Sequence, residues 1–542
     1  MLFVPRVSTS LLLLASGFAA VAVSAQNAAQ SPAISISTRL VEVGVIVRDK
    51  NGPVRDLMKD DFVVLDRGKP QRISVFTVES GRPEDQPVQP LPPNTFSDLP
   101  QYAASAPRSV TIVLLDNLNT LYGSAPGPYE STPYWFEDFA LANAKAHLVE
   151  FIKQLDPRDR VAIYGLADSL HVLCDFTSDR SELLEILTKY DTSSKTNRGA
   201  VQPGATHTPV PGGFNANVDQ SNLQLASAAN QRRAETTMAA LQAIAAHVAN
   251  IPGRKNLVWL TANLPFSGTA MARILNPART AAYPVDGRGL LTRNSPGGLE
   301  GTMDEDALAR GNFMPAQSPQ PVGIDTMQEM AEETGGQAFV NTNDLTGAIR
   351  TAVEGSSVTY TLGFYLDTSS ADGKFHALKI QVKRSGLRVR YPNGYFAFHD
   401  EPATKNQNYR SLVTALRSPV ESSLIPVQIK IVRVEQPLPH CLSVFGSVDI
   451  HNLRLVQNGD KRKGALEVVT VEQDETGKVL SKSANRINLD FTSEQYASYL
   501  KSGFTFHQFI QPQEGMTTLR IVVEDPRTAE VGSLIVPISQ LK

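Results

Sequence analysis

The stretch Arg108-Ser-Val-Thr-Ile-Val-Leu-Leu-Asp-Asn-Leu-Asn-Thr120 decides the fold predicted for this chain. Residues 110–115 form an uncharged run of apolar and β-branched side chains that stops at Asp116. A short run of this kind is typical of a central strand in a parallel sheet that is covered on both faces. The polar loop that follows would then lie at the carboxyl end of the strand, where open α/β sheets bind their ligands.

The loop after this strand has two interpretations. Asp116, Asn119 and Thr120 offer a carboxylate, an amide and a hydroxyl, and oxygen ligands of this kind suit a hard cation such as Mg²⁺. Alternatively, the loop is only a polar turn from strand to helix, in which Thr120 or Asn119 caps the next helix. The loop by itself leaves both interpretations open.

Strands alternate with helices from residue 108 onward, which indicates βα units around a parallel sheet. A hairpin partner strand is expected at 171–176, and Gly335-Gly336 is a signal for a helix end. The pattern predicts a doubly wound α/β domain over 108–354. Its further strands are expected at 160–166, 256–261, 281–286 and 338–340, and its helices at 137–155, 180–189, 223–250, 324–333 and 345–353.

The first 25 residues have the features of a secretory signal peptide. One basic residue, Arg6, precedes an apolar stretch at 11–23, and Val23-Ser-Ala25 ends in the pattern of a cleavage site. The apolar part is too short for a convincing membrane span. We expect cleavage before Gln26, export to the periplasm or the cell exterior, and no membrane span in the mature chain.

Length and composition restrict the class of protein. A chain of 542 residues, 42% of them apolar, is long enough for about three globular domains after signal removal. The net charge of -3 gives no electrostatic argument for binding nucleic acid. The two cysteines, Cys174 and Cys441, do not make a disulfide framework, and we expect both to be small buried side chains.

Alternating strand patterns flank the α/β region on both sides. Residues 38–80 and 355–398 each contain three such patterns, and each set has one apolar face that needs cover. We expect the two sets to form one small β-sandwich into which the α/β domain is inserted, so that Val43 and Val45 contact Leu362, Ile380 or Val382. Residues 81–107, rich in Pro, Ser and Asp, are interpreted as a linker.

The remaining chain predicts another β domain. Residues 399–424 are interpreted as a linker with a short helix, and 425–542 as a C-terminal β-sandwich because apolar alternation returns there. Within it, Thr492-Ser-Glu-Gln495 is a capping box for one small helix.

Several short motifs occur in the order found in one known family. The chain resembles the von Willebrand factor A-related proteins first grouped from acidobacteria, over residues 38–400. The motifs are Val45-Ile-Val-Arg-Asp-Lys-Asn-Gly-Pro-Val54, Asp60-Asp-Phe-Val-Val-Leu-Asp66, Leu114-Leu-Asp-Asn-Leu-Asn-Thr120, Glu333-Thr-Gly-Gly-Gln-Ala-Phe339, and Gly386-Leu-Arg-Val-Arg-Tyr391 with Gly394-Tyr395.

The resemblance implies protein–protein contact or adhesion through a metal-ion-dependent site. The family motif is Asp-x-Ser-x-Ser, with a Thr from a second loop and an Asp from a third. Asp116 and Thr120 match its first and fifth positions, whereas Leu118 at the third has no ligand atom.

The other two loops complete the implied metal site only in part. Thr236 or Thr237 is the candidate for the second-loop Thr, and Ala262 occupies the place of the third-loop Asp. The site is therefore expected to be degenerate, comprising Asp116, Asn119, Thr120 and one of the two threonines. It should bind Mg²⁺ weakly or not at all, and no other cofactor is expected.

Enzyme motifs are missing from the sequence. It contains no Gly-x-Ser-x-Gly, His-Glu-x-x-His, P-loop or Cys-x-x-Cys pattern. Asp168 and Asp286 end strands and are candidates either for a site or for capping and turns. We expect a non-enzymatic, exported module that binds an unknown protein or cell-envelope ligand. The alternatives are a metal-independent structural or assembly component of the envelope and, third, an unrecognised hydrolase.

Overall fold

The computed structural model describes residues 39–79, 91–98, 110–120, 135–157, 159–190, 215–251, 253–264, 266–290, 323–354, 358–366, 372–397, 402–436 and 439–541. The signal peptide expected at 1–25 lies outside these residues, as does most of the linker expected at 81–107. No helix in the described part of the chain is long and apolar enough to cross a membrane.

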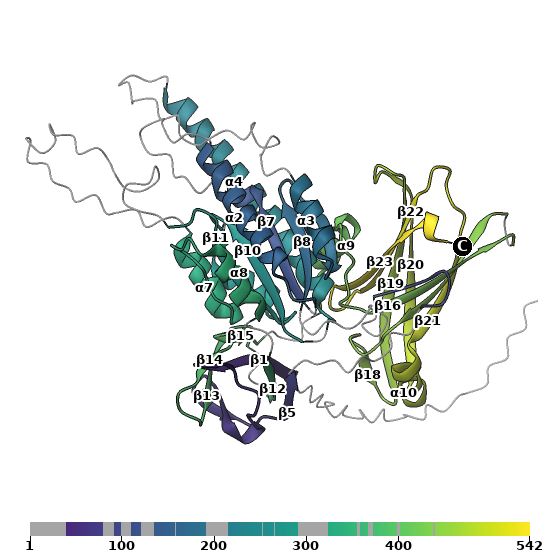
Figure 1. Ribbon diagram of the computed structural model, residues 1–542. Coiled ribbons are helices and arrows are strands. Elements are labelled where there is room, and N and C mark those ends of the chain that lie inside the picture. Colours follow the sequence, from purple (N-terminus) through teal and green to yellow (C-terminus); the bar gives the residue numbers. More distant parts are fainter. Residues whose placement is uncertain are drawn as a thin grey trace, which may run out of the picture.

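The run that ends at Asp116 is a strand in the middle of a five-stranded sheet with the order β11-β10-β7-β8-β9 (Figure 1). All seven residues of β7 are buried, as expected of an uncharged run. β9 is antiparallel to β8, and the other neighbours are parallel. The strands are β7 (Val110–Asp116), β8 (Arg160–Leu166), β9 (Leu170–Thr177), β10 (Lys255–Thr261) and β11 (Thr280–Asp286).

Helices cover both faces of this sheet. Alternate residues of β7 therefore pack into two different cores. Ile112 and Leu114 pack with α4 (Asn215–Val248), α5 (Gly268–Leu275) and α7 (Ile324–Thr334). Val113 and Leu115 pack with α2 (Trp135–Lys153), α3 (Arg180–Lys189) and α8 (Leu345–Glu354). A strand buried on both sides has no polar face, which explains the continuous apolar run in the sequence.

Two elements of this unit differ from the predictions. Helix α5 was not predicted, because its eight residues are too short for a clear period. The Ser267 hydroxyl caps its first turn, and Met271 and Leu275 are buried. The strand expected at 338–340 is only a single parallel bridge between Val285 and Phe339.

The segments before and after the α/β unit share two sheets. In the first, β1 (Arg39–Asp49) pairs with β12 (Thr359–Leu366), and Val43 lies opposite Leu362, so the predicted contact between these residues is present. In the second, β3 (Phe62–Asp66) pairs with β13 (Phe375–Val382). The remaining strands are β2 (Gly52–Pro53), β4 (Lys69–Gln71), β5 (Val75–Glu79), β14 (Arg388–Arg390) and β15 (Gly394–Phe396). We call this the split β unit.

A buried tyrosine ties the two halves of the split β unit together. The Tyr360 hydroxyl donates to the carbonyl of Val54 at 2.9 Å and accepts from the amide of Leu57 at 3.3 Å. Its ring lies 5.2 Å from that of Phe62, centroid to centroid. Residues about 300 positions apart therefore share one core.

The C-terminal unit also has two sheets, with the orders β21-β17-β16-β6 and β18-β19-β22-β23, and β20 pairs with β19. Ile429 and Val444 of the first sheet share one core with Leu466 and Ile521 of the second. The strands are β16 (Val427–Val434), β17 (Cys441–Val448), β18 (Val456–Asn458), β19 (Lys461–Gln473), β20 (Val479–Thr492), β21 (Phe504–Ile510), β22 (Thr518–Asp525) and β23 (Glu530–Pro537), and the helix α10 (Ser493–Ser502) begins at the predicted capping box.

The structure corrects the interpretation of 81–107 as linker throughout. β6 (Thr95–Ser97) pairs with β16 at the edge of the C-terminal sheet, and Phe96 packs against that core. A strand of only three residues is enough to cover part of a sheet edge. Three residues are too few to show the alternation of apolar and polar side chains by which a strand is predicted. Cys174 and Cys441 are buried and free, as expected.

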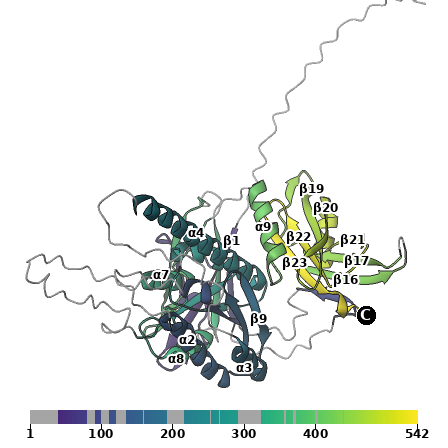
Figure 2. The same ribbon diagram turned by 90° about the horizontal axis from the view of Figure 1, so that it is seen from above.

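Helix α9 (Lys405–Arg417) lies between the α/β unit and the C-terminal unit in both views (Figures 1 and 2). Its residue Ala415 packs with Val522 and Val531 of the C-terminal sheet. Beyond the helix, the amide of Ser423 donates to the carbonyl of Ala246 at the end of α4, at 3.0 Å. The predicted linker at 399–424 therefore makes specific contacts with both units.

Candidate functional site

The carboxylate of Asp116 is the centre of the predicted site, and it is completely buried. Its Oδ1 accepts from the backbone N–H of Asn119 at 2.8 Å, which closes the short helix α1 (Asn117–Thr120) onto the strand end. Its Oδ2 accepts from the side-chain amide of Asn119 at 2.9 Å and from the indole N–H of Trp259 at 2.8 Å. Protein donors thus surround a carboxylate that the family resemblance would assign to a metal.

The second-loop threonine is Thr237. Its hydroxyl is buried and accepts from the side-chain amide of Asn119 at 3.0 Å. Thr236, its neighbour on α4, is only half-buried, whereas Thr237 reaches Asn119. The main chain of Thr120 ends α1, whereas its side chain lies outside the described part of the structure.

The amide nitrogen of Asn119 lies between Asp116 and Thr237 and donates to both. A cation bridging a carboxylate and a hydroxyl would have to take this same place. Leu118 and Ala262 are buried apolar residues and supply no oxygen ligand from their side chains. As arranged here, the side chains of Asn119 and Trp259 present nitrogen donors to Asp116, whereas a hard cation requires oxygen ligands.

The pKa of Asp116 shows the balance of these interactions. Burial raises the pKa of this carboxyl to about 6, while the hydrogen bonds from Asn119 and Trp259 act in the opposite direction. Removing one donor should raise the pKa further. The sequence pattern did not point to Trp259 as a site residue, although a buried indole N–H usually has an acceptor, and this general rule was the available signal.

The other two candidate aspartates are paired with nearby basic side chains. Asp286 is buried and binds the guanidinium of Arg288 through both oxygens, at 2.8 and 2.9 Å. Asp168 lies just beyond the end of β8, and its exposed carboxylate is 2.9 Å from Nε2 of His171. Each of these aspartates is thus paired with its own basic neighbour, and the structure does not join either of them to Asp116 in one site.

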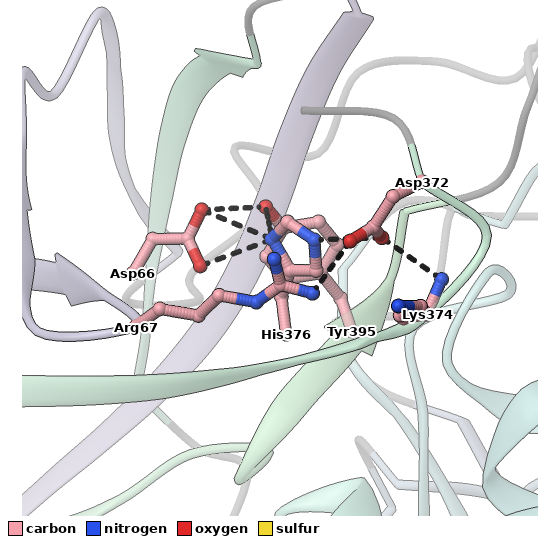
Figure 3. Close-up of polar contacts among 6 residues, drawn as sticks. All are labelled: Asp66, Arg67, Asp372, Lys374, His376 and Tyr395. Atoms are coloured by element: carbon pink, nitrogen blue, oxygen red, sulfur yellow. Dashed lines mark hydrogen bonds and ion pairs between the residues drawn. The ribbon is translucent and has the colours of Figure 1, made fainter. Parts of the chain in front are cut away.

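A second polar cluster lies in the split β unit, around the buried imidazole of His376 (Figure 3). Nδ1 of His376 is 3.2 Å from both carboxylate oxygens of Asp66, and Nε2 is 3.1 Å from Oδ1 of Asp372. Arg67 binds the other oxygen of Asp372 at 2.9 Å. The hydroxyl of Tyr395 donates to Asp66 at 2.9 Å.

This His376 cluster serves to hold strands together. Burial and the Asp66 carboxylate raise the pKa of the Tyr395 hydroxyl, which is the opposite of nucleophile activation. The backbone N–H of Lys374 and the side chains of Arg67 and His376 lower the pKa of Asp372. The cluster joins β3, β13 and β15 by hydrogen bonds. Among the described residues, no group of three or more His, Cys, Asp or Glu side chains is arranged to hold a metal ion.

No protein-family model and no curated protein matches the chain. Solved structures similar to it include an aerotolerance-related membrane protein from Bacteroides fragilis (15% identity, 45% of this chain and 98% of that chain, TM-score 0.24). BatB from Bacteroides thetaiotaomicron has 13% identity over 45% of this chain and 96% of that chain, with a TM-score of 0.24. The VWA domain of SpRpn10 has 14% identity over 46% of this chain and 97% of that chain, with a TM-score of 0.20. Similarities with such low TM-scores carry no conclusion about function.

Proposed function

We propose that the chain is an exported, non-enzymatic protein-binding module with a von Willebrand A-like domain whose metal site is degenerate. The observation that supports this proposal best is the Asn119 amide, which donates to Asp116 and Thr237 where a metal would bridge them. Hydrogen bonds fix the carboxyl edge of the sheet, so partner binding needs no cation. The partner is a protein or a cell-envelope ligand.

Exposed side chains at the same edge can carry the contact. The turn after β8 presents Asp168 and His171, whose side chains are 75% and 51% exposed. Because parallel strands end at one edge, this turn belongs to the same edge as Asp116 at the end of β7. An exposed, hydrogen-bonded Asp–His pair beside a buried polar network suits recognition of a polar surface on a partner.

Calorimetric titration with Mg²⁺ and Mn²⁺ tests the metal-free part of the proposal. We expect no saturable binding at millimolar concentrations, and no increase in melting temperature beyond that caused by matched ionic strength. For a cation to bind, the side-chain amide of Asn119 would have to rotate away. The cation would also have to compete with the hydrogen bond from Trp259 to Asp116. Micromolar Mg²⁺ affinity that disappears in Asp116→Ala would overturn the degenerate site and restore metal-dependent adhesion.

Capture of partners from the envelope fraction of the native host tests the binding surface. The double variant Asp168→Ala/His171→Ala should lose the captured protein, whereas EDTA should have no effect. Arg384→Ala is a matched control, because Arg384 forms an equally exposed pair with Asp56 in the split β unit. Capture that persists in the double variant but is lost with EDTA would contradict both parts of the proposal.

A second candidate function, an assembly component of the envelope, rests on a different observation. The outer face of β17 and β21 carries exposed Phe445 and Phe509, with His507 stacked on Phe445 at 4.3 Å between ring centroids. Exposed aromatic groups of this kind mark contact surfaces. If this surface carries the contact, Phe445→Ser/Phe509→Ser should abolish capture and the Asp168/His171 double variant should retain it.

A further inference from the structure

A cavity of about 430 Å³ lies between the split β unit and the amino ends of β10 and β11. Its walls come from β1 and β12 on one side and from the segments before β10 and after α5 on the other. This is the opposite end of the sheet from Asp116. Its volume falls in the range of about 300–1,000 Å³ that is usual for small-molecule sites, and such sites favour the junction between units.

Positive charge dominates the lining of this cavity. Arg254, Arg273 and Arg279 line it, and Glu42 is the one acidic side chain in the lining. Glu42 is 3.5 Å from Arg279, and both side chains are about one-third exposed, so this pair is partly open to solvent. Arg273 lies over the ring of Phe396, 4.8 Å from its centroid, which holds its guanidinium against the wall.

Arg254 is the most unusual of the three arginines. It is 95% buried, with a relative exposure of 5%, and one of its terminal nitrogens donates to the carbonyl of Gly335. Its Nε has no hydrogen-bond partner among the residues that the structure describes. A buried guanidinium with an unused donor is costly unless a ligand or water supplies the acceptor.

We propose that this cavity binds a small organic anion, whose carboxylate or phosphate group is held by Arg254, Arg273 and Arg279. The guanidinium fork matches the geometry of both groups, which explains why arginines gather where such anions bind. Thr280 and Thr361 also line the cavity, so part of its wall is polar but uncharged. Phe396 supplies an apolar wall for the remainder of the ligand.

The neighbouring Lys255 is sensitive to the charge of Arg279. It is fully buried at the start of β10, and its pKa is lowered to about 7 by burial first and by Arg279 second. The carboxylate of Glu79 raises the pKa of Lys255, but burial raises the pKa of Glu79 itself. An anion in the cavity would offset the repulsion between Lys255 and Arg279, and protons should be taken up on binding.

Calorimetry of the full chain with inorganic phosphate and, separately, with succinate tests the proposal. Phosphate and succinate are the probes for the two anion classes, and NaCl of equal ionic strength is the reference for both. We expect saturable binding of at least one probe and a rise in melting temperature of about 3–5 °C at 100 times the dissociation constant. The probe that binds more tightly identifies the phosphate or carboxylate class.

Arg273→Met and Arg279→Met are the test variants, because these side chains are not fully buried and can be replaced without opening the core. Each should weaken binding at least tenfold, and the double variant should abolish it. Arg384→Met, in the exposed pair with Asp56, should bind the probe as the unmodified chain does. Binding of neither probe, or binding that the double variant retains, would overturn the proposal.

Discussion

Trp259 donates its indole N–H to Oδ2 of Asp116 at 2.8 Å, across two neighbouring parallel strands. Trp259 lies opposite Leu114 in the register of β10 and β7. Asp116 is two residues further along β7 than Leu114, so all three side chains lie on one face of the sheet. The register of these strands therefore fixes which donor reaches the buried carboxylate.

Replacing this donor should destabilise the α/β unit. In Trp259→Phe, Asp116 loses the hydrogen bond from the indole without gaining access to water. We expect a loss of about 1–3 kcal/mol in the free energy of unfolding, measured by urea denaturation. The pKa of Asp116 should also rise above 6, since a donor to the charged form has been removed.

Tyr283→Phe is the matched control for this prediction. Tyr283 is a buried aromatic residue on the adjacent strand β11, and its hydroxyl has no hydrogen-bond partner among the described residues. Its removal should change stability little or increase it. Equal losses in the two variants would contradict a specific contribution of the hydrogen bond from Trp259 to Asp116.

The stability of the α/β unit should depend on pH through Asp116. Its folded pKa of about 6 lies above the ordinary value of 3.8, so protonation favours the folded state. This contribution is complete below about pH 4 and is lost as the pH rises through 6. The stability of the natural chain relative to Asp116→Asn should therefore fall by up to about 3 kcal/mol between pH 4 and 7. A difference that is constant over this range would contradict the buried carboxylate.

Glu524 in the C-terminal unit should act in the same direction at higher pH. Its side chain is buried, neither oxygen has a hydrogen-bond partner among the described residues, and Glu467 lies opposite it on β19. Burial first, then Glu467 and Asp525, raise its pKa to about 8. The unfolded carboxyl ionises near pH 4.5 and the folded one only near pH 8, so the natural chain loses stability between these two values. Glu524→Gln should therefore leave the melting temperature unchanged below about pH 4.5 and raise it by an amount that grows up to about pH 8. Exposed Glu475→Gln should have no effect at either pH.

The His376 cluster should be sensitive to loss of its imidazole. His376→Phe keeps a buried ring but leaves the carboxylate of Asp66 without one of its partners. We expect a loss of about 3 kcal/mol in unfolding free energy, comparable with breaking other buried charged pairs. His171→Phe, which breaks only an exposed pair with Asp168, should change stability by less than about 0.5 kcal/mol. A similar loss in both variants would refute a structural role for the buried cluster.

Deleting residues 39–79 should expose the strands that follow the α/β unit. β12 would lose both neighbouring strands, β1 and β5, and β13 would lose β3. Limited proteolysis should then cut within 359–391 rapidly, while the α/β unit persists as a protected fragment. Protection of 359–391 in the deleted chain would show that these strands are stable without their partners.

The sequence by itself predicted the elements whose pattern is local. The run before Asp116 is a central strand, Gly335 ends α7 with a φ of 72°, and Thr492 begins α10. Each of these follows from the side-chain period or from one capping residue. Short elements were missed, since β6 and α5 contain too few residues to establish a period.

Only the tertiary structure decided the site. The sequence could not distinguish Thr236 from Thr237 as the threonine of the site. The packing of α4 turns Thr237 toward Asn119. The tertiary structure also brings Trp259 to Asp116 and places three arginines from separate segments around one cavity. Local patterns record which face of an element is buried. The register and packing of distant elements determine which polar groups meet, because each such contact joins residues whose separation in sequence carries no signal.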